Sequence, residues 1–269
     1  MIRINRNRIN SLPSEYILIW CIAQSNMGRA GFVFPEYITT EEVMTDVEFW
    51  DVHTEEWEDL IPGVNGSPLG NPTQYGFTHE LGYRLKLKYP DKKIRFFLAA
   101  RGGATIGRRG AIPNFFHTGA YPDLLDPENE ENWWSRIKNQ YAAALAGMSY
   151  IDLGALWIQG ESNCIEGFPE MVDPYQVWEK NLVQEFQDLT GRKQFVCINV
   201  PHPDITNDEM WDSNPEYVTA VRNAHIANNS LGYFSHYRDT TDVNLKEDNV
   251  HLDAAAVQTI SAWLMENVY

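Results

Sequence analysis

The chain has 269 residues, of which 43% are hydrophobic and 22% charged, a composition that argues against a disordered or fibrous protein. Its 37 Asp and Glu outnumber its 21 Lys and Arg, and the net charge of -16 argues against a nucleic-acid partner and against adsorption to anionic membranes. No apolar run approaches the roughly 18 residues of a membrane span, so we expect no membrane partner.

Short, nearly continuous apolar runs recur along the chain, as expected for parallel strands that are covered on both faces. They occupy residues 16–22, 94–100, 153–158 and 194–200, with a weaker run at 233–237. Each run is followed by a change to polar or glycine-rich sequence. The pattern predicts strands that end where chemistry-bearing residues begin.

Helical spacing of apolar residues fills the stretches between these runs. One helix is predicted before Pro90, others over 134–148 and 175–189, one from Asn214-Pro215 and a last one after Asp253. For the helix over 175–189, Asp173 is the predicted N-cap, Pro174 the first turn and Gly191 the residue past the end.

Strands that alternate with helices predict one α/β domain over residues 1–269. We expect a three-layer sandwich with a doubly wound, mostly parallel sheet of about five strands. Two long segments, near 38–74 and 101–128, break the alternation and are predicted as insertions, the first with a hairpin that pairs 47–50 with the stretch around Trp57. Loops of this length in a compact domain are often functional.

The three cysteines, Cys21, Cys164 and Cys197, are widely spaced, which predicts buried free thiols rather than a disulfide framework. No spacing indicates a zinc site, so we expect no metal and no other cofactor. The N-terminal arginines are not followed by a small-residue cleavage site, so no signal peptide is recognised. Three localisations stay open: a cytoplasmic protein, one released without a signal, for instance with a phage, or an exported protein whose leader is missing from this sequence.

Polar and glycine residues follow three of the predicted strands, at the sheet edge where ligands of such folds bind. Ser25 follows the first, Arg101-Gly102-Gly103 the second and Gln159-Gly160-Glu161 the third. Taken alone, a serine there is most often a turn or cap, paired glycines are as readily a flexible turn, and Gln and Glu are usually part of a structural network.

A carboxylate and a histidine precede the last predicted helix. Asp248 lies three residues before His251 and can orient the imidazole through Nδ1. The alternatives are a capping Asp beside a surface His, or half of a metal site. The other six histidines are expected at the surface or in packing: His53, His79, His117, His202, His225 and His236.

Together these residues supply a nucleophile, oxyanion donors, a base and an orienting acid, which is the set that an acyl-transfer enzyme needs. Their order is also familiar: the chain resembles the SGNH-hydrolase superfamily, and within it carbohydrate esterase family 6 and the sialate O-acetylesterase-like group. The resembling blocks are Gln24-Ser25-Asn26-Met27-Gly28, Gly102-Gly103-Ala104-Thr105-Ile106, Gln159-Gly160-Glu161-Ser162 and Asp248-Asn249-Val250-His251. The resemblance implies a flavodoxin-like sheet.

The resemblance implies a role for each matching position. Ser25 would be the nucleophile, His251 the base and Asp248 the group that orients His251. The oxyanion would be bound by the backbone N–H groups of Ser25 and of Gly103 or Gly102, and by the side chain of Gln159. Glu161 also matches a family position, and we interpret it as an anchor for the Gln159 loop; Asn26 is predicted to support the site residues without contacting the substrate.

The chain departs from the family pattern at two places. Ile158 stands where the family often has His before Gln-Gly-Glu, and the second block runs into Gly107-Arg108-Arg109.

Charge is distributed unevenly along the chain: residues 41–59 hold nine acids and no Lys or Arg, whereas from Arg84 to Arg109 there are nine Lys and Arg and only one acid. Three of them, Arg101, Arg108 and Arg109, predict a positive rim that tolerates acidic sugars.

The sequence therefore predicts a serine esterase that removes acetyl groups from a carbohydrate without a cofactor, leaving the sugar and the oligomeric state open. One alternative is a lipase or thioesterase of the same superfamily. Another is a non-catalytic carbohydrate-binding protein, for example of a virion. A nucleotide-binding protein is a distant third, because the glycine spacing is wrong for phosphate binding.

Overall fold

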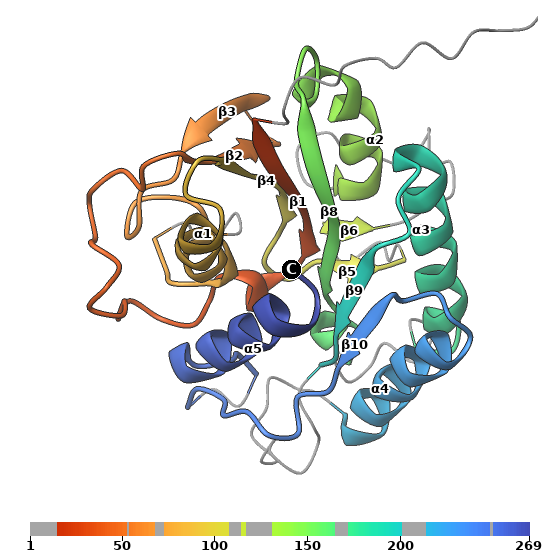
Figure 1. The fold of residues 1–269 in the computed structure, drawn as a ribbon. Coiled ribbons are helices and arrows are strands. Elements are labelled where there is room, and N and C mark those ends of the chain that lie inside the picture. The colour runs from red at the N-terminus through yellow and green to blue at the C-terminus, as the bar shows by residue number, and fades with distance from the viewer. Residues whose placement is uncertain are drawn as a thin grey trace, which may run out of the picture.

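The fold was analysed in a computed structural model, which describes residues 15–52, 54–67, 73–107, 114–116, 131–164, 172–200, 214–247 and 250–269. A seven-stranded sheet with the order β10-β9-β8-β1-β4-β2-β3 lies at its centre. Helices cover both faces of the sheet in three layers (Figure 1). Its strands are β1 Tyr16–Ala23, β2 Val47–Asp51, β3 Glu56–Asp59, β4 Lys93–Ala100, β8 Tyr150–Ile158, β9 Phe195–Ile198 and β10 His236–Arg238.

The helices divide the core into two parts. α1 (Phe77–Lys88) and α5 (Ala254–Asn267) pack on one face of the sheet, and α2 (Trp133–Ala144), α3 (Tyr175–Thr190) and α4 (Pro215–Ser230) on the other. A small second sheet is made of β5 (Thr105–Ile106), β6 (Asn114–Phe116) and β7 (Glu131–Asn132). The doubly wound, mostly parallel α/β sheet predicted from the sequence is thereby confirmed.

The sheet has seven strands rather than about five, because the predicted hairpin joins it. β2 pairs in parallel with β4, and β3 pairs antiparallel with β2, with Trp50 opposite Trp57. Phe49 and Trp50 of β2 are buried, so this strand belongs to the core and not to a detached loop. The fully paired hairpin extends the sheet at one edge.

The helix boundaries follow local capping chemistry. The Asp253 side chain accepts a hydrogen bond from Ala256 N at 2.7 Å and begins α5, and Asn214 accepts from Glu216 N at 2.8 Å and begins α4. Gly191 ends α3 in the left-handed conformation, as predicted. The prediction of Asp173 as N-cap of α3 is wrong: Pro174 takes that place, and no side chain caps the helix.

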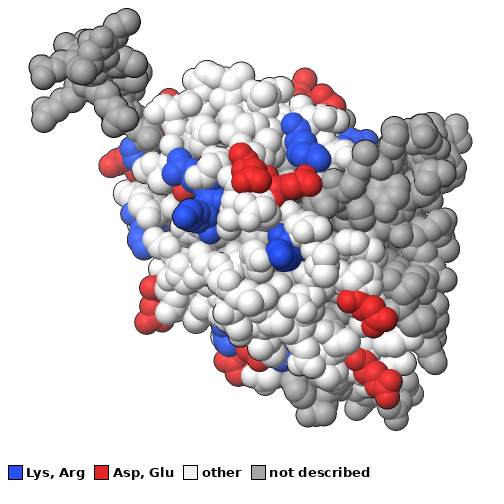
Figure 2. Space-filling model, turned by 90° about the vertical axis from the view of Figure 1, so that its right-hand side faces the viewer, with Lys and Arg blue, Asp and Glu red and all other residues white. Residues whose placement is uncertain are grey.

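The acidic and basic segments neutralise each other across neighbouring elements. Arg95 of β4 donates from Nε to Glu48 of β2 at 2.6 Å, and Lys86 of α1 lies 3.2 Å from Asp46. On the described part of the face drawn in Figure 2, acidic and basic side chains likewise lie near one another and form no field of one sign. The uneven charge of the sequence is therefore partly absorbed by contacts within the fold.

The three cysteines are buried and free, as predicted. No helix among the described segments is long and apolar enough to cross a membrane.

Strand β8 contains an extra residue at Gly154. The pairing between β1 and β8 shifts register between Leu18 and Trp20, and Gly154 has a φ of 85°. Its N–H donates to Asp152 Oδ1 at 2.7 Å. A Cβ built on Gly154 would lie 2.1 Å from Gln194 O, so no side chain fits without moving the neighbouring chain. The irregularity is a β-bulge that only glycine can occupy here.

Gly154→Ala is therefore expected to lower the free energy of unfolding by about 3 kcal/mol, from the left-handed backbone and the clash together. Gly147→Ala is the matched control, because Gly147 has a φ of 72° but nothing lies within 4 Å of its Cβ position. This control should cost only about 1 kcal/mol. Urea unfolding measures both, and equal losses would show that the contact with Gln194 is unimportant.

His79 of α1 is buried in a setting that favours its neutral form. Its Nε2 lies 2.9 Å from Asn65 O, and its Nδ1 has no hydrogen-bond partner among the described residues. Burial lowers the pKa of His79 from 6.5 to about 4. Since the unfolded chain then binds more protons at acidic pH, His79 lowers stability as the pH falls below 6.5.

We expect this effect to amount to about 2 kcal/mol between pH 7 and pH 5. His79→Gln keeps a donor for Asn65 O and removes the titration, so its unfolding free energy should fall less over the same interval. Urea unfolding at both pH values measures the difference. His236→Gln, at a partly exposed position, is measured alongside and shows the effect of replacing a histidine that is not buried. An unchanged dependence in His79→Gln would contradict the assignment.

Candidate active site

The parallel register brings three predicted strand ends to one edge of the sheet. Ala23 of β1 lies opposite Ala100 of β4 and Ile158 of β8. The ladders continue one residue further, with Arg101 N donating to Ala23 O at 3.2 Å and Gln24 N to Ile158 O at 3.0 Å. The segment after β1 is thereby flanked by the glycine turn after β4 and by the segment after β8.

Ser25 and His251 meet at this edge although 226 positions separate them in the chain. Ser25 begins the short 3-10 helix η1 (Ser25–Met27), and His251 precedes α5. Ser25 Oγ lies 2.9 Å from His251 Nε2, and both residues are buried. At this distance the hydroxyl can donate to the ring nitrogen, which is the relation between a nucleophile and its general base.

The Asn26 side chain ties the His251 segment to the sheet edge. Its Nδ2 donates to Val250 O at 3.2 Å and to Glu161 Oε1, and its Oδ1 accepts from Leu252 N at 2.8 Å. The backbone is therefore held on both sides of His251. A carboxamide suits this place because it donates and accepts at once.

Glu161 begins the 3-10 helix η2 (Glu161–Cys164), directly after β8. Burial raises the pKa of Glu161 above its ordinary range, and the hydrogen bond from Asn26 opposes that shift. The Ser162 hydroxyl adds a second link by donating to Gln24 Oε1 at 2.6 Å. η1 and η2 are thus joined by side-chain hydrogen bonds.

Among the described residues, no acceptor is found for the backbone N–H groups of Ser25, Gly102 and Gly103 at this edge. Gly103 has a φ of 76°, which favours glycine, and no described residue lies within 4 Å of its Cβ position. Within the part of the chain that the structure describes, the space over this turn is open. Unsatisfied N–H groups beside a nucleophile can stabilise a developing oxyanion.

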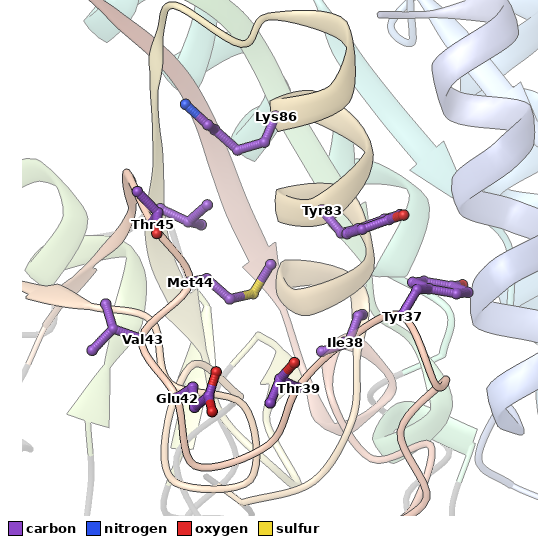
Figure 3. Close-up of a pocket in the computed structure, with 10 residues that line it drawn as sticks. Tyr37, Ile38, Thr39, Glu42, Val43, Met44, Thr45, Tyr83 and Lys86 are labelled. Atoms are coloured by element: carbon purple, nitrogen blue, oxygen red, sulfur yellow. The ribbon is translucent and has the colours of Figure 1, made fainter.

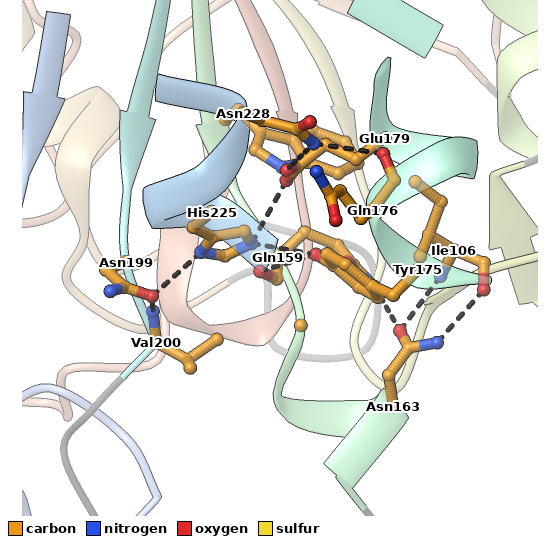
Figure 4. Close-up of polar contacts among 12 residues, drawn as sticks. Ile106, Gln159, Asn163, Tyr175, Gln176, Glu179, Asn199, Val200, His225 and Asn228 are labelled. Carbon is orange, nitrogen blue, oxygen red and sulfur yellow. Dashed lines mark hydrogen bonds and ion pairs between the residues drawn. The ribbon is translucent and has the colours of Figure 1, made fainter. Parts of the chain in front are cut away.

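Gln159 is fully buried and its carboxamide is tied into an internal network (Figure 4). Nε2 donates to Ala104 O at 3.2 Å and to Asn163 Oδ1 at 2.9 Å, and Oε1 accepts from the Tyr175 hydroxyl at 2.6 Å. Both amide protons therefore have acceptors within the protein. Its role as an oxyanion donor stays a prediction.

Of the remaining predicted residues, Asp248, Arg108 and Arg109 lie outside the described residues, and Arg101 is half-buried at the end of β4. Arg29 was not predicted, yet its Nη1 lies 3.4 Å from His251 Nε2. The only sequence signal for Arg29 was its position directly after the first block.

A pocket of about 310 Å³ lies between the segment that precedes β2 and α1 (Figure 3). The rings of Tyr37 and Tyr83 lie at its side, with centroids 4.6 Å apart, and Met44 points toward the helix. The described residues that line it are Tyr37, Ile38, Thr39, Glu42, Val43, Met44, Thr45, Val47, Tyr83 and Lys86. None of the predicted catalytic residues is among them.

Glu179, Cys197 and His225 bring potential metal-ligand atoms within 4.8 Å of one another. The Glu179 carboxylate, however, already accepts from Trp157 Nε1 at 2.7 Å and Asn228 Nδ2 at 2.8 Å. Burial raises the pKa of Cys197 well above its ordinary range, so the thiol is not a ready thiolate ligand. The donor set fits a hydrogen-bond network better than a metal.

Comparison with solved structures relates the whole fold to known proteins. A protein from Arabidopsis thaliana is 16% identical with a TM-score of 0.63, over 96% of this chain and 100% of that one. NanS is 14% identical with a TM-score of 0.61, over 96% and 98%. A carbohydrate acetylesterase from Xanthomonas citri is 13% identical with a TM-score of 0.56, over 91% of this chain and 54% of that one. These likenesses show the shared fold.

None of the curated protein sequences compared with the chain matches it. The family described as "Carbohydrate esterase, sialic acid-specific acetylesterase" matches residues 16–269. That range contains every predicted catalytic position. The chain therefore belongs to this family of carbohydrate esterases.

Proposed function

We propose that the chain is a serine esterase that hydrolyses O-acetyl esters on carbohydrates. The observation that carries the proposal is the 2.9 Å approach of Ser25 Oγ to His251 Nε2 at the carboxyl edge of the sheet. Membership of a carbohydrate-esterase family supports an ester bond as the bond that is cleaved and a carbohydrate as the substrate. The space over Gly103, which no described residue fills, supports room for an acyl group beside Ser25.

In the proposed reaction, Ser25 Oγ attacks the acetyl carbonyl while its proton passes to His251 Nε2. The tetrahedral intermediate collapses when the imidazolium returns that proton to the departing sugar oxygen, which leaves an acetyl-enzyme. Water, deprotonated by His251, then attacks the acetyl carbonyl. Acetate leaves and the Ser25 hydroxyl is restored.

The oxyanion of each tetrahedral intermediate is proposed to lie against the N–H groups of Ser25 and Gly103, with Gly102 as the neighbouring donor. Removal of one oxyanion donor typically costs about 10²–10³ in rate. The carboxamide of Gln159 can join as third donor by exchanging its longer bond, the one to Ala104 O at 3.2 Å. Asp248 is proposed to orient His251 from its Nδ1 side.

Two reagents test the function directly. The wild-type chain should hydrolyse p-nitrophenyl acetate, and a p-nitrophenyl phosphonate should add once, on Ser25, as shown by mass spectrometry of the labelled peptide. A protein that only binds carbohydrate would give neither result. Labelling at another residue would overturn the assignment of Ser25.

A series of esters with longer acyl chains separates this proposal from the lipase and thioesterase alternative. We expect kcat/KM to fall as the acyl chain lengthens beyond acetyl. Acetylated xylan, acetylated sialic acid and acetylated O-antigen can then be compared as substrates. A preference for long acyl chains would favour the alternative.

A further inference from the structure

Tyr175, the first residue of α3, lies at the centre of a buried hydrogen-bond network (Figure 4). Its hydroxyl donates to Gln159 Oε1 at 2.6 Å, and on its other side lies His225 Nε2 at 3.0 Å. All three residues are fully buried. Water therefore does not compete for these bonds, and their geometry fixes the orientation of the carboxamide.

The hydrogen-bond partners of His225 indicate which of its ring nitrogens carry protons. The Tyr175 hydroxyl has one proton, and it donates this proton in a hydrogen bond to Gln159 Oε1, which can only accept. His225 Nε2 must then be a donor. Its Nδ1 lies 2.8 Å from Asn199 Oδ1, which is also an acceptor only and already receives Val200 N at 2.9 Å. Both ring nitrogens of His225 therefore carry protons.

The carboxylate of Glu179 supplies the negative charge that balances a doubly protonated, positively charged His225 ring. Its Oε1 lies 3.0 Å from His225 Nε2, and both side chains are fully buried. The carboxylate is further satisfied by Trp157 and Asn228. A buried ion pair with all its bonds made resists rearrangement, because moving one partner leaves the other charge unpaired. The pair thus holds the Tyr175 hydroxyl toward Gln159.

The other end of the network reaches the glycine turn of the active site. Gln159 Nε2 donates to Ala104 O and to Asn163 Oδ1. Asn163 in turn accepts from Ile106 N at 3.0 Å and donates to Ile106 O at 3.0 Å. The backbone of 104–106, which directly follows Gly102 and Gly103, is therefore clamped by two carboxamides.

We propose that Tyr175, held by the His225–Glu179 ion pair, is a positioning residue for the oxyanion site. It sets the orientation of Gln159, and Gln159 with Asn163 sets the place of the Gly103 N–H. This inference rests on the proposed esterase function. It assigns catalytic importance to Tyr175, His225 and Glu179, which act on the oxyanion site only through Gln159.

Tyr175→Phe removes one hydroxyl and keeps the ring. We expect kcat for p-nitrophenyl acetate to fall about 10-fold, the weight of one buried hydrogen bond, while KM changes less than about twofold. The rate of phosphonate labelling at Ser25 should fall by a similar factor, since that reaction also needs the oxyanion site. Glu179→Gln, which removes the charge at nearly constant volume, should act in the same direction and is the second variant if Tyr175→Phe does not fold.

Tyr237→Phe is the matched control. The Tyr237 hydroxyl accepts from Asn199 Nδ2 and, among the described residues, has no hydrogen bond to Tyr175, Gln159 or Asn163, so it lies outside the proposed route from Tyr175 to the glycine turn. Its loss should leave kcat and labelling unchanged. Thermal unfolding of each variant is measured alongside, and activity is assayed where every variant remains folded, so that a loss of stability alone does not register as a loss of kcat.

A double-mutant cycle with Gln159→Met tests the route. If Tyr175 acts through Gln159, then Tyr175→Phe has no further effect on kcat in the Gln159→Met background. If the losses of kcat in the two single variants multiplied in the double variant, the inference would be overturned. Equal kcat in wild type, Tyr175→Phe and Tyr237→Phe would also overturn it. The esterase proposal would stand in both cases. A wild-type chain that neither hydrolyses acetyl esters nor reacts with the phosphonate would overturn both.

Discussion

Ser25→Ala is expected to lower kcat for p-nitrophenyl acetate by about 10⁶-fold, the loss typical when a nucleophilic serine is removed from a triad. The physical reason is that His251 Nε2 loses the only hydroxyl that the described structure places within its reach. The substitution deletes one oxygen at a buried position, so the fold should be retained. Steady-state kinetics and thermal unfolding measure the two quantities separately.

Ser261→Ala is the matched control for this variant. Ser261 is a buried serine of α5 whose hydroxyl has no hydrogen-bond partner in the part of the chain that the structure describes. Its loss should leave kcat unchanged. Activity of Ser25→Ala within tenfold of wild type would refute the mechanism, and Ser261→Ala shows whether removing any buried hydroxyl from this fold impairs the enzyme.

His251→Ala is expected to reduce kcat by roughly the same factor, about 10⁶-fold, because the serine hydroxyl is a weak nucleophile without a base. The double variant Ser25→Ala/His251→Ala should be no slower than either single variant, since nucleophile and base act as a unit. Phosphonate labelling of Ser25 should also be lost in His251→Ala. Losses that multiply in the double variant would show that the two residues act independently.

His236→Ala serves as the comparison for His251→Ala. His236 lies in β10, within hydrogen-bond reach of Ser235 Oγ at 3.2 Å. We expect wild-type kinetics from it. If both histidine variants lost activity equally, the effect would come from the fold and not from a base at position 251.

The central sheet was predictable because strands that are buried on both faces consist of nearly continuous apolar residues, and such runs are visible in the sequence. The run at 16–22 became β1, in the middle of the sheet, with every residue from Ile17 to Ala23 fully buried. β3, at the edge, reads Glu56-Trp57-Glu58-Asp59 and carries no such run. Its place in the sheet depends on pairing with β2, and the strand count was accordingly too low.

Strand ends locate a site but do not orient its side chains. Ser25, Gly103 and Gln159 were predicted from their positions after three strands, and the parallel register brings them to one edge. Which way the Gln159 carboxamide turns depends on Tyr175, whose position at the start of α3 marks it only as a core residue. The hydrogen-bond partners of a buried amide depend on tertiary contacts. Such contacts leave no periodic pattern in the sequence from which they could be predicted.

The bulge at Gly154 decides which layer of the sandwich the Gln159 side chain meets. Before it, Tyr150 points to the layer of α2, α3 and α4; after it, Trp157 points to that same layer although the two residues lie seven positions apart. In an unbroken strand their directions would be opposite. Removing one residue upstream of β8's end would therefore turn Gln159 toward α1 and α5, away from Tyr175. The extra residue at Gly154 thus determines which helical layer the Gln159 side chain faces at the carboxyl edge of the sheet.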